Sequence, residues 1–341
     1  MRPPAFWAGP RDTLSARLLS SLEGLTAMAT ARRVARTGFR ASVPVICCGN
    51  VTVGGAGKTV VALDLTQRLA AMGRRVHVLL RGYGGTLRGP HRVSADDDSA
   101  RVGDEALLLA VVAPTWIGAD RAASARAAIA AGADILLLDD GLQNPTLSKD
   151  LSLLVIDGGS GFGNRRLLPA GPLREPIAVA ASRCHAAVLI GPDRTNAAAA
   201  LPPALLVLRA NLVPGPEVAA LADRAVLAFA GIGRPEKFFA TLAEAGARLV
   251  ATEPFADHHP YRAAEIDRLL DRAARLGAVA VTTAKDAVRV PPPLRGHVEV
   301  ARVSLAWDDA VGLGAILSRF SISSPQGASH GRQADDDGRE H

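Results

Sequence analysis

The chain has 341 residues and a net charge of +6; 48% of its residues are hydrophobic but only 4% are aromatic. This length can bury a large core, so we expect two domains or one large one, packed mainly by Ala, Val and Leu. The basic balance is consistent with an anionic partner such as a nucleotide, a phospholipid or a nucleic acid, whereas three cysteines exclude a disulfide framework and favour a reducing cytosol.

The N-terminal segment, residues 11–37, is predicted to be a single helix. Its leucines recur at helical spacing, at Leu14, Leu18, Leu22 and Leu25. Together with Trp7 and several arginines, this stripe is typical of a helix in a membrane interface, but a helix packed on the protein core explains it equally well. The sequence lacks an apolar run of about 18 residues, so membrane contact would be peripheral.

A predicted strand at 43–49 runs directly into a glycine-rich loop and a predicted helix at 60–72. Glycines in such a loop let backbone N–H groups turn around an anion, and the helix directs its positive end at the same place. Lys58 would reach the terminal phosphates and the Thr59 hydroxyl would ligate Mg²⁺. The phosphate-binding residues predicted by this pattern are Thr52, Val53, Gly54, Gly55, Ala56, Gly57, Lys58, Thr59 and Val60.

Strands and helices alternate through the rest of the chain, which predicts a P-loop NTPase-like α/β fold with a mostly parallel sheet. Strands are expected at 75–80, 115–118, 134–140, 151–157, 185–190, 226–233, 247–252 and 279–283. A proline-rich stretch around 202–216 suggests a boundary between two α/β halves. We predict an N-terminal membrane-associating region at 1–40, a phosphate-binding core at 41–215, a smaller α/β domain at 216–320 and a disordered tail at 321–341.

Carboxylates stand at two informative positions. Asp139 and Asp140 end an apolar strand, where an acid steers Mg²⁺ in nucleotide triphosphatases, and the upstream phosphate loop favours this role over that of a solvated strand end. Asp104 and Glu105 precede the apolar start of a predicted helix at 104–112. An Asp there is typical of a helix cap, but it is also placed to act as a general base.

Two further segments have alternative interpretations. His258 and His259 follow Asp257; adjacent histidines chelate a metal poorly, but one beside a carboxylate can orient a base. The segment 164–176 is too rich in Pro and Gly for regular structure. Its arginines, including Arg174, suit a clamp for a substrate phosphate, although a packed crossover loop fits as well.

Several motifs occur together and in order between about Phe6 and Phe320. They are residues 49–50 with 54–59, 81–84 (Arg-Gly-Tyr-Gly), 103–105 (Gly-Asp-Glu), 139–143 (Asp-Asp-Gly-Leu-Gln), 169–176 (Pro-Ala-Gly-Pro-Leu-Arg-Glu-Pro), 255–258 (Phe-Ala-Asp-His) and 282–286 (Thr-Thr-Ala-Lys-Asp). As a set, they resemble the tetraacyldisaccharide 4′-kinases, the lipid A kinases of Gram-negative bacteria. Two positions depart from that pattern, Leu142 in place of Phe and Asn144 in place of His.

The resemblance implies transfer of the ATP γ-phosphate to the 4′-hydroxyl of a tetraacyldisaccharide 1-phosphate, with Mg²⁺ as the metal. It also implies a role for each motif residue: Asp104 as base, His258 as its partner, Lys58 and Thr59 on phosphate and Mg²⁺, Asp139 and Asp140 on the metal, and Glu105, Arg121 and Arg174 lining the site. The N-terminal helix would dock on the cytoplasmic face of the inner membrane. Of the two histidines, we expect His258 to face the site.

Three other classes of protein share single features with this sequence. A membrane-associated switch ATPase carries a Lys before the two loop glycines, where this chain has Val53. A GTPase needs an Asn-Lys-x-Asp element, and the nearest candidate, residues 284–286, has the wrong spacing. Nucleic-acid binding has only the basic pI in its favour, because the sequence shows no aromatic and basic stacking surface. A switch ATPase or GTPase without a lipid acceptor is the remaining alternative.

Overall fold

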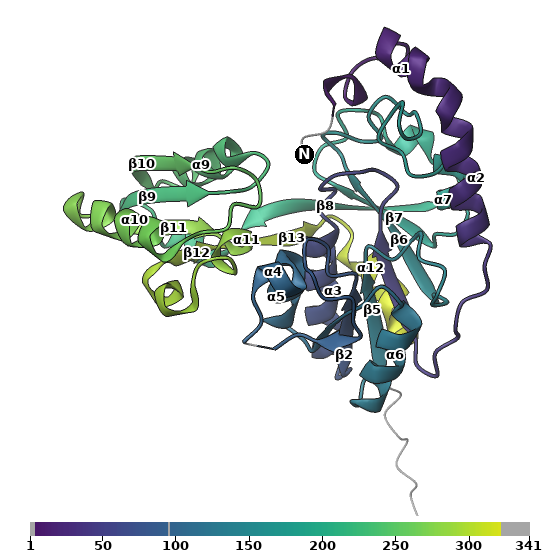
Figure 1. Cartoon of the computed structure of the whole chain (residues 1–341), viewed down its shortest axis with the longest axis horizontal. Coiled ribbons are helices and arrows are strands. Elements are labelled where there is room, and N and C mark those ends of the chain that lie inside the picture. The colour runs from purple at the N-terminus through teal and green to yellow at the C-terminus, as the bar shows by residue number, and fades with distance from the viewer. Residues whose placement is uncertain (1–3, 95, 322–341) are drawn as a thin grey trace, which may run out of the picture.

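The computed structural model describes residues 4–94 and 96–321, which form two sheets with helices on their faces (Figure 1). The larger sheet contains, in spatial order, β13 (Val303–Trp307), β8 (Leu206–Pro214), β7 (Ala186–Ile190), β6 (Leu151–Asp157), β1 (Val45–Gly49), β5 (Ile135–Asp139), β2 (Val76–Leu80), β4 (Thr115–Ile117) and β3 (His91–Arg92). Its strands pair in parallel except at the two edges, where β13 and β3 are antiparallel to their neighbours.

Both faces of the larger sheet are buried, which explains why its strands read as continuous apolar runs. On β1, Ile46 and Cys48 enter the core on one face, whereas Val45 and Cys47 enter the core on the other. The first face is covered by α3 (Lys58–Ala71), α5 (Asp104–Ala110) and α12 (Ala310–Leu317). The second is covered by α6 (Arg121–Ala130) and α7 (Ile177–Ala181). The predicted α/β class is confirmed.

A smaller, fully parallel sheet forms the second half of the molecule, to the left in Figure 1. Its strands are, in spatial order, β10 (Arg248–Pro254), β9 (Ala225–Ala230), β11 (Val279–Thr283) and β12 (Glu299–Ala301). On one face, α9 (Pro235–Glu244) buries Phe239 and Leu242, and on the other α10 (Ala263–Arg275) buries Ile266 and Leu269. Each face of this sheet thus has a core of its own.

The second half is shorter than predicted, because the chain returns to the larger sheet after residue 301. Strand β13 pairs along β8, with Leu305 opposite Leu212, and α12 buries Leu313 and Leu317 in the core of the larger sheet. Residues 303–317 therefore pack with the first half and not, as predicted, with the second. Strand β8 leads the chain out to the second half, and β13 brings it back (Figure 1).

The N-terminal segment is broken and does not form the single predicted helix. It contains α1 (Leu14–Leu19), a 3₁₀ turn (Ser20–Leu22) and α2 (Glu23–Val34). The four leucines of the predicted stripe are exposed, with exposed fractions of 74%, 71%, 43% and 60% for Leu14, Leu18, Leu22 and Leu25. The inner face is held by polar contacts, because Thr26 Oγ1 donates to the Leu168 carbonyl at 2.7 Å and Thr30 Oγ1 to that of Arg174 at 3.0 Å. The stripe is thus not a core-packing face.

Short elements complete the described chain. They are α4 (Ser99–Val102), α8 (Pro216–Ala219), α11 (Ala284–Ala287) and 3₁₀ turns at Ala5–Trp7, Ala198–Ala200, Pro292–His297 and Ser318–Phe320. Within residues 4–94 and 96–321, no helix combines the length and apolar character needed to cross a bilayer. The tail predicted to be disordered lies, beyond Ser321, outside the described residues.

Candidate active site

The glycine-rich loop joins β1 to α3 and turns at Gly57, the residue before the first turn of the helix. Gly57 has φ of 82°, and a Cβ there would lie 2.6 Å from Ile190 Cδ1, so the turn needs glycine for both conformation and space. Lys58 extends back along the loop, with Nζ 3.2 Å from Asn50 Oδ1 and 3.7 Å from Asp140 Oδ1. The amide of Asn50 in turn donates to Thr52 Oγ1 at 3.1 Å. The Lys58 ammonium and the N-terminus of α3, which carries partial positive charge, thus lie at the same loop.

Asp139 ends β5 beside the first turn of α3. Its Oδ2 accepts a hydrogen bond from Thr59 Oγ1 at 3.2 Å, whereas Oδ1 is buried and has no hydrogen-bond partner in the described part of the chain. Burial, with a contribution from the charge of Glu105, raises the pKa of Asp139 above its usual range. A buried carboxylate with an unused oxygen beside a hydroxyl is a donor set that fits a hard cation such as Mg²⁺.

The protein offers this cation few ligands. The described residues contain no group of three or more His, Cys, Asp or Glu side chains arranged to hold a metal.

Asp140, the next residue, is turned away by a left-handed φ of 54° and is paired with cations. Arg174 Nη1 lies 3.1 Å from each of its oxygens. Although burial alone would raise the pKa of Asp140, the charges of Lys58 and Arg174 outweigh it and hold that pKa below its usual range. Arg174 comes from the predicted irregular loop, which lies against the phosphate loop because its backbone N–H donates to Val51 O at 2.7 Å. The structure thus brings Asp140, Lys58 and Arg174 together.

Arg121 and Glu105 differ in burial and in their contacts. Arg121 starts α6 with only 2% of its surface exposed, and its Nη1 donates to the carbonyl of Gly118. Burial, partly opposed by the charge of Asp140, lowers its pKa to about 10. Arg121 is therefore a buried positive charge near Asp140. Glu105 is partly exposed and forms an ion pair of 3.8 Å with Lys285 of the second half.

Asp104 is the first residue of α5 and does not cap it. The N-cap is Gly103, whose φ of 88° and close approach to the Tyr83 carbonyl demand glycine, and no side chain caps the helix there. The Asp104 carboxylate points instead to the second half. Its Oδ2 lies 2.8 Å from His258 Nδ1 and 3.3 Å from Arg289 Nε, while Oδ1 makes no hydrogen bond to the described residues.

His258 and His259 have separate surroundings. The ring of His258 is half exposed, and its hydrogen bond to Asp104 raises its pKa above the usual range against the opposing effect of desolvation. The ring of His259 lies against Phe255, and its Nε2 is 3.2 Å from Glu265. The structure therefore directs His258 toward Asp104, as expected, and His259 away from it.

Sequence reasoning missed several residues of this cluster. Gln143 donates to the Asn50 carbonyl at 2.8 Å and to Glu175 at 2.9 Å, and thus joins the phosphate loop to the arginine loop. Gln143 and Glu175 both belong to motifs that carry the family resemblance, but the sequence assigned a role to neither. Arg289 has no motif of its own, although it follows the 282–286 motif by one turn and a buried cation there must find an anion.

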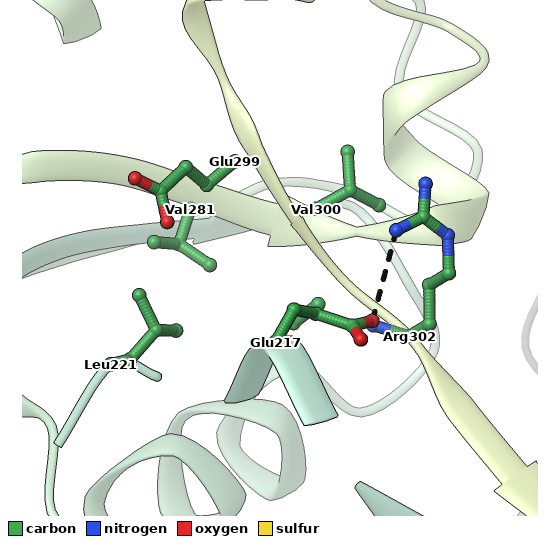
Figure 2. A pocket seen from close by; sticks show the side chains of 7 residues that line it. Glu217, Leu221, Val281, Glu299, Val300 and Arg302 are labelled. Carbon is green, nitrogen blue, oxygen red and sulfur yellow. Dashed lines mark hydrogen bonds and ion pairs between the residues drawn. The ribbon is translucent and has the colours of Figure 1, made fainter. Parts of the chain in front are cut away.

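A cavity of about 180 Å³ lies elsewhere, beside β11 and β12 of the smaller sheet (Figure 2). Its charged lining is already paired, since Arg302 donates its backbone N–H to Glu217 at 2.7 Å and Glu299 pairs with Arg224 at 2.6 Å. None of its lining residues is a predicted site residue.

The chain is similar to known proteins over most of its length. The sequence matches the family Tetraacyldisaccharide-1-P 4′-kinase over residues 15–320. It is 59% identical to a Tetraacyldisaccharide 4′-kinase from Gluconacetobacter diazotrophicus, with 91% of this chain and 95% of that protein covered, and 55% identical to one from Rhodospirillum centenum, with 93% and 96% covered.

The fold is also similar to a solved structure, that of LpxK from Aquifex aeolicus in complex with ATP. The TM-score is 0.72 at 25% sequence identity, and the similarity covers 90% of this chain and 99% of that one. The family match spans both halves of the molecule and every residue of the polar cluster described above. The chain belongs to the tetraacyldisaccharide 4′-kinase family, and is therefore a kinase.

Proposed function

We propose that the chain transfers the γ-phosphoryl group of ATP to the 4′-hydroxyl of tetraacyldisaccharide 1-phosphate, a lipid A precursor. The observation that carries this proposal is the 2.8 Å contact between Asp104 and His258 across the two halves. A carboxylate that is held by a histidine, with one oxygen left without a hydrogen bond, is a general base for an acceptor hydroxyl. A switch ATPase needs no such acceptor base.

The nucleotide would bind at the loop from Thr52 to Val60. In this assignment the loop N–H groups and the α3 N-terminus bind the phosphates, and Lys58, fixed by Asn50, neutralises their terminal charge. The ATP complex of the structurally similar LpxK supports this assignment. The position of Lys58 against Asp140 supports it as well, since the ammonium already lies beside the acidic end of β5.

Thr59 and Asp139 would hold Mg²⁺, with Asp140 near it. The buried, unpartnered Oδ1 of Asp139 supports this role. When bound, Mg²⁺ neutralises charge on the phosphates and orients them for transfer.

Transfer would then follow an in-line course. Asp104 accepts the proton of the sugar hydroxyl while the hydroxyl oxygen forms a bond to the γ-phosphorus. The bond between that phosphorus and the β–γ bridging oxygen breaks, and ADP is released. His258 holds Asp104 by its Nδ1, and its cationic form stabilises the carboxylate. Nη1 of Arg174 donates to Asp140 and Gln143, which leaves the other guanidinium nitrogens for a substrate phosphate. The buried Arg121 adds positive charge near Asp140. Glu105, beside Asp104, would contact the acceptor.

The outward leucine stripe would lie on a membrane surface, where the acceptor lipid resides. The exposed leucines of α1 and α2 are followed by exposed arginines that suit anionic headgroups, Arg32, Arg33 and Arg36. We assign this surface to the cytoplasmic face of the inner membrane, because ATP is supplied from that side.

The decisive assay supplies labelled ATP with either the disaccharide lipid or buffer alone. We expect label in the lipid, and expect Asp104→Ala to abolish transfer while nucleotide binding is kept. Asp271→Ala, which removes an exposed carboxylate from α10, serves as a control and should behave like the wild type. ATP hydrolysis that ignores the lipid would instead support the switch alternative. Loss of folding in Asp104→Ala would return Asp104 to a structural role.

A further inference from the structure

An arginine with only 3% of its side chain exposed lies between the two halves of the molecule and touches Asp104. Arg289 belongs to the second half, two residues after the end of α11, which packs against α5 (Figure 1). Its Nε is 3.3 Å from Asp104 Oδ2, the oxygen that also faces His258. A buried guanidinium needs a partner for its charge and for its donors, so the whole of its environment is informative.

The guanidinium is fixed in orientation by groups other than Asp104. Its Nη2 donates to Asp286 Oδ1 at 2.8 Å and to the Gly231 carbonyl at 3.0 Å, and its Nη1 donates to the His259 carbonyl at 3.0 Å. Its Nε donates to the Lys285 carbonyl at 3.2 Å. Because Asp286 already neutralises the charge, the fold has no need of a second carboxylate at this place.

Asp286 is itself fully buried and locked. Besides Arg289, its Oδ1 accepts from the backbone N–H of Gly231 and from the Tyr261 hydroxyl, both at 2.8 Å. The carbonyl of the same Gly231 accepts the backbone N–H of His258 at 3.0 Å. The two cations that touch Asp104 therefore stem from one rigid unit, built from Asp286, Gly231 and Tyr261.

We propose that Arg289 is a positioning residue, anchored by Asp286, that holds the Asp104 carboxylate in the orientation for proton transfer. This inference rests on the proposed function, and it gives the 282–286 motif a role. With Oδ2 held by Arg289 and His258, Oδ1 is the oxygen presented to the acceptor.

Loss of Arg289 should affect the proton-transfer step rather than nucleotide binding. Arg289→Gln leaves Asp104 held by His258 alone, and a misplaced base costs on the order of 10²-fold in kcat. KM for ATP should be unchanged, because Arg289 has no contact with the phosphate loop. Arg289→Lys keeps the charge but lacks the fork that reaches Asp286 and Asp104 at once, so its kcat should lie between those of the wild type and Arg289→Gln.

A second readout is independent of the reaction. The charged groups facing His258 are Asp104, Asp257 and Lys285. Removing the nearby Arg289 cation leaves Asp104 free to attract the imidazolium more strongly, so the pKa of His258 should rise further in Arg289→Gln. Nuclear magnetic resonance of histidine-labelled full-length protein measures it, with His258→Asn to assign the signal.

Arg295→Gln is the matched control. Arg295 also donates to backbone carbonyls of the second half, those of Val290 at 2.8 Å and Val288 at 2.9 Å, but it has no contact with Asp104. We expect it to keep the wild-type kcat and His258 pKa, and we use its melting temperature to measure the cost of losing carbonyl contacts.

The proposal is overturned by a wild-type kcat in Arg289→Gln, by an equal loss in Arg295→Gln, or by an unchanged His258 pKa. If Arg289→Gln does not fold, Arg289→Lys decides through the same two readouts. A wild-type protein that leaves the lipid unlabelled would overturn the proposed function instead. The histidine titration would then still test whether Arg289 acts on Asp104.

Discussion

The exposed leucines of α1 and α2 allow the expected strength of membrane binding to be calculated and tested. Leu14 and Leu18 are 74% and 71% exposed, so replacing both with Ser removes apolar surface without disturbing the core. Fully burying one leucine contributes about 2 kcal/mol, and scaling by these exposed fractions gives roughly 1.5 kcal/mol each, about 3 kcal/mol for the pair. Since about 1.4 kcal/mol corresponds to a factor of ten, the double variant should bind vesicles roughly 10²-fold more weakly.

Sedimentation with vesicles that contain anionic lipid measures this partition directly. Val311→Ser is the control, because Val311 is 83% exposed but lies on α12, away from the stripe. Its partition should equal that of the wild type. The exposed arginines of α2 add a salt-dependent part, which should persist in the double variant. Equal sedimentation of wild type and double variant would refute the membrane role of the leucines.

Three further predictions concern the polar cluster. Lys58→Ala should abolish ATP binding in calorimetry, since the ammonium is the loop's main charge on the terminal phosphates; retained affinity would exclude the assigned loop. Asp139→Asn should raise the Mg²⁺ concentration needed for half-maximal activity, and an unchanged Mg²⁺ dependence would contradict its role. The pKa of His258 is raised from 6.5 in the folded protein, so the stabilisation by its pair with Asp104 is complete below that value and lost as pH rises through the raised pKa. The difference in melting temperature between wild type and His258→Asn should therefore shrink over that range, and a constant difference would contradict the pairing.

Local sequence patterns predicted most helices and strands, but they could not predict contacts between segments far apart in the sequence. The apolar run at 134–140 became β5 within one residue at each end, because a strand buried on both faces must be apolar throughout. The return of β13 to β8 was missed, since a five-residue strand carries no mark of its partner. The N-terminal stripe was predicted as one helix because periodicity registers the repeat of leucines but not the 3₁₀ turn within it.

Residues of the candidate site were predicted where a sequence motif implied them. They were missed where only the packing of the fold brings them to the site. The contact between Asp104 and His258 joins residues 154 apart in the sequence, and only the family resemblance paired them. The sequence around Asp104 was also consistent with a helix cap, because an acid before an apolar run occurs at helix caps as well as at catalytic positions. The structure separates the two readings: Gly103 occupies the cap, and the carboxylate faces across to the second half.

In the proposed mechanism, the two halves of the chain have different tasks. The glycine-rich loop, Asp139 and Arg174 belong to the larger sheet, where Lys58 and Arg174 both pair with Asp140. The groups that orient Asp104 all come from the smaller sheet and its loops, and they approach α5 as a rigid unit fixed by Asp286. Changes to the first set should thus alter nucleotide binding, whereas changes to the second should alter the proton-transfer step. Comparing ATP affinity with kcat in Lys58→Ala and Arg289→Gln therefore tests this division: the first variant should lose affinity, and the second should lose kcat alone.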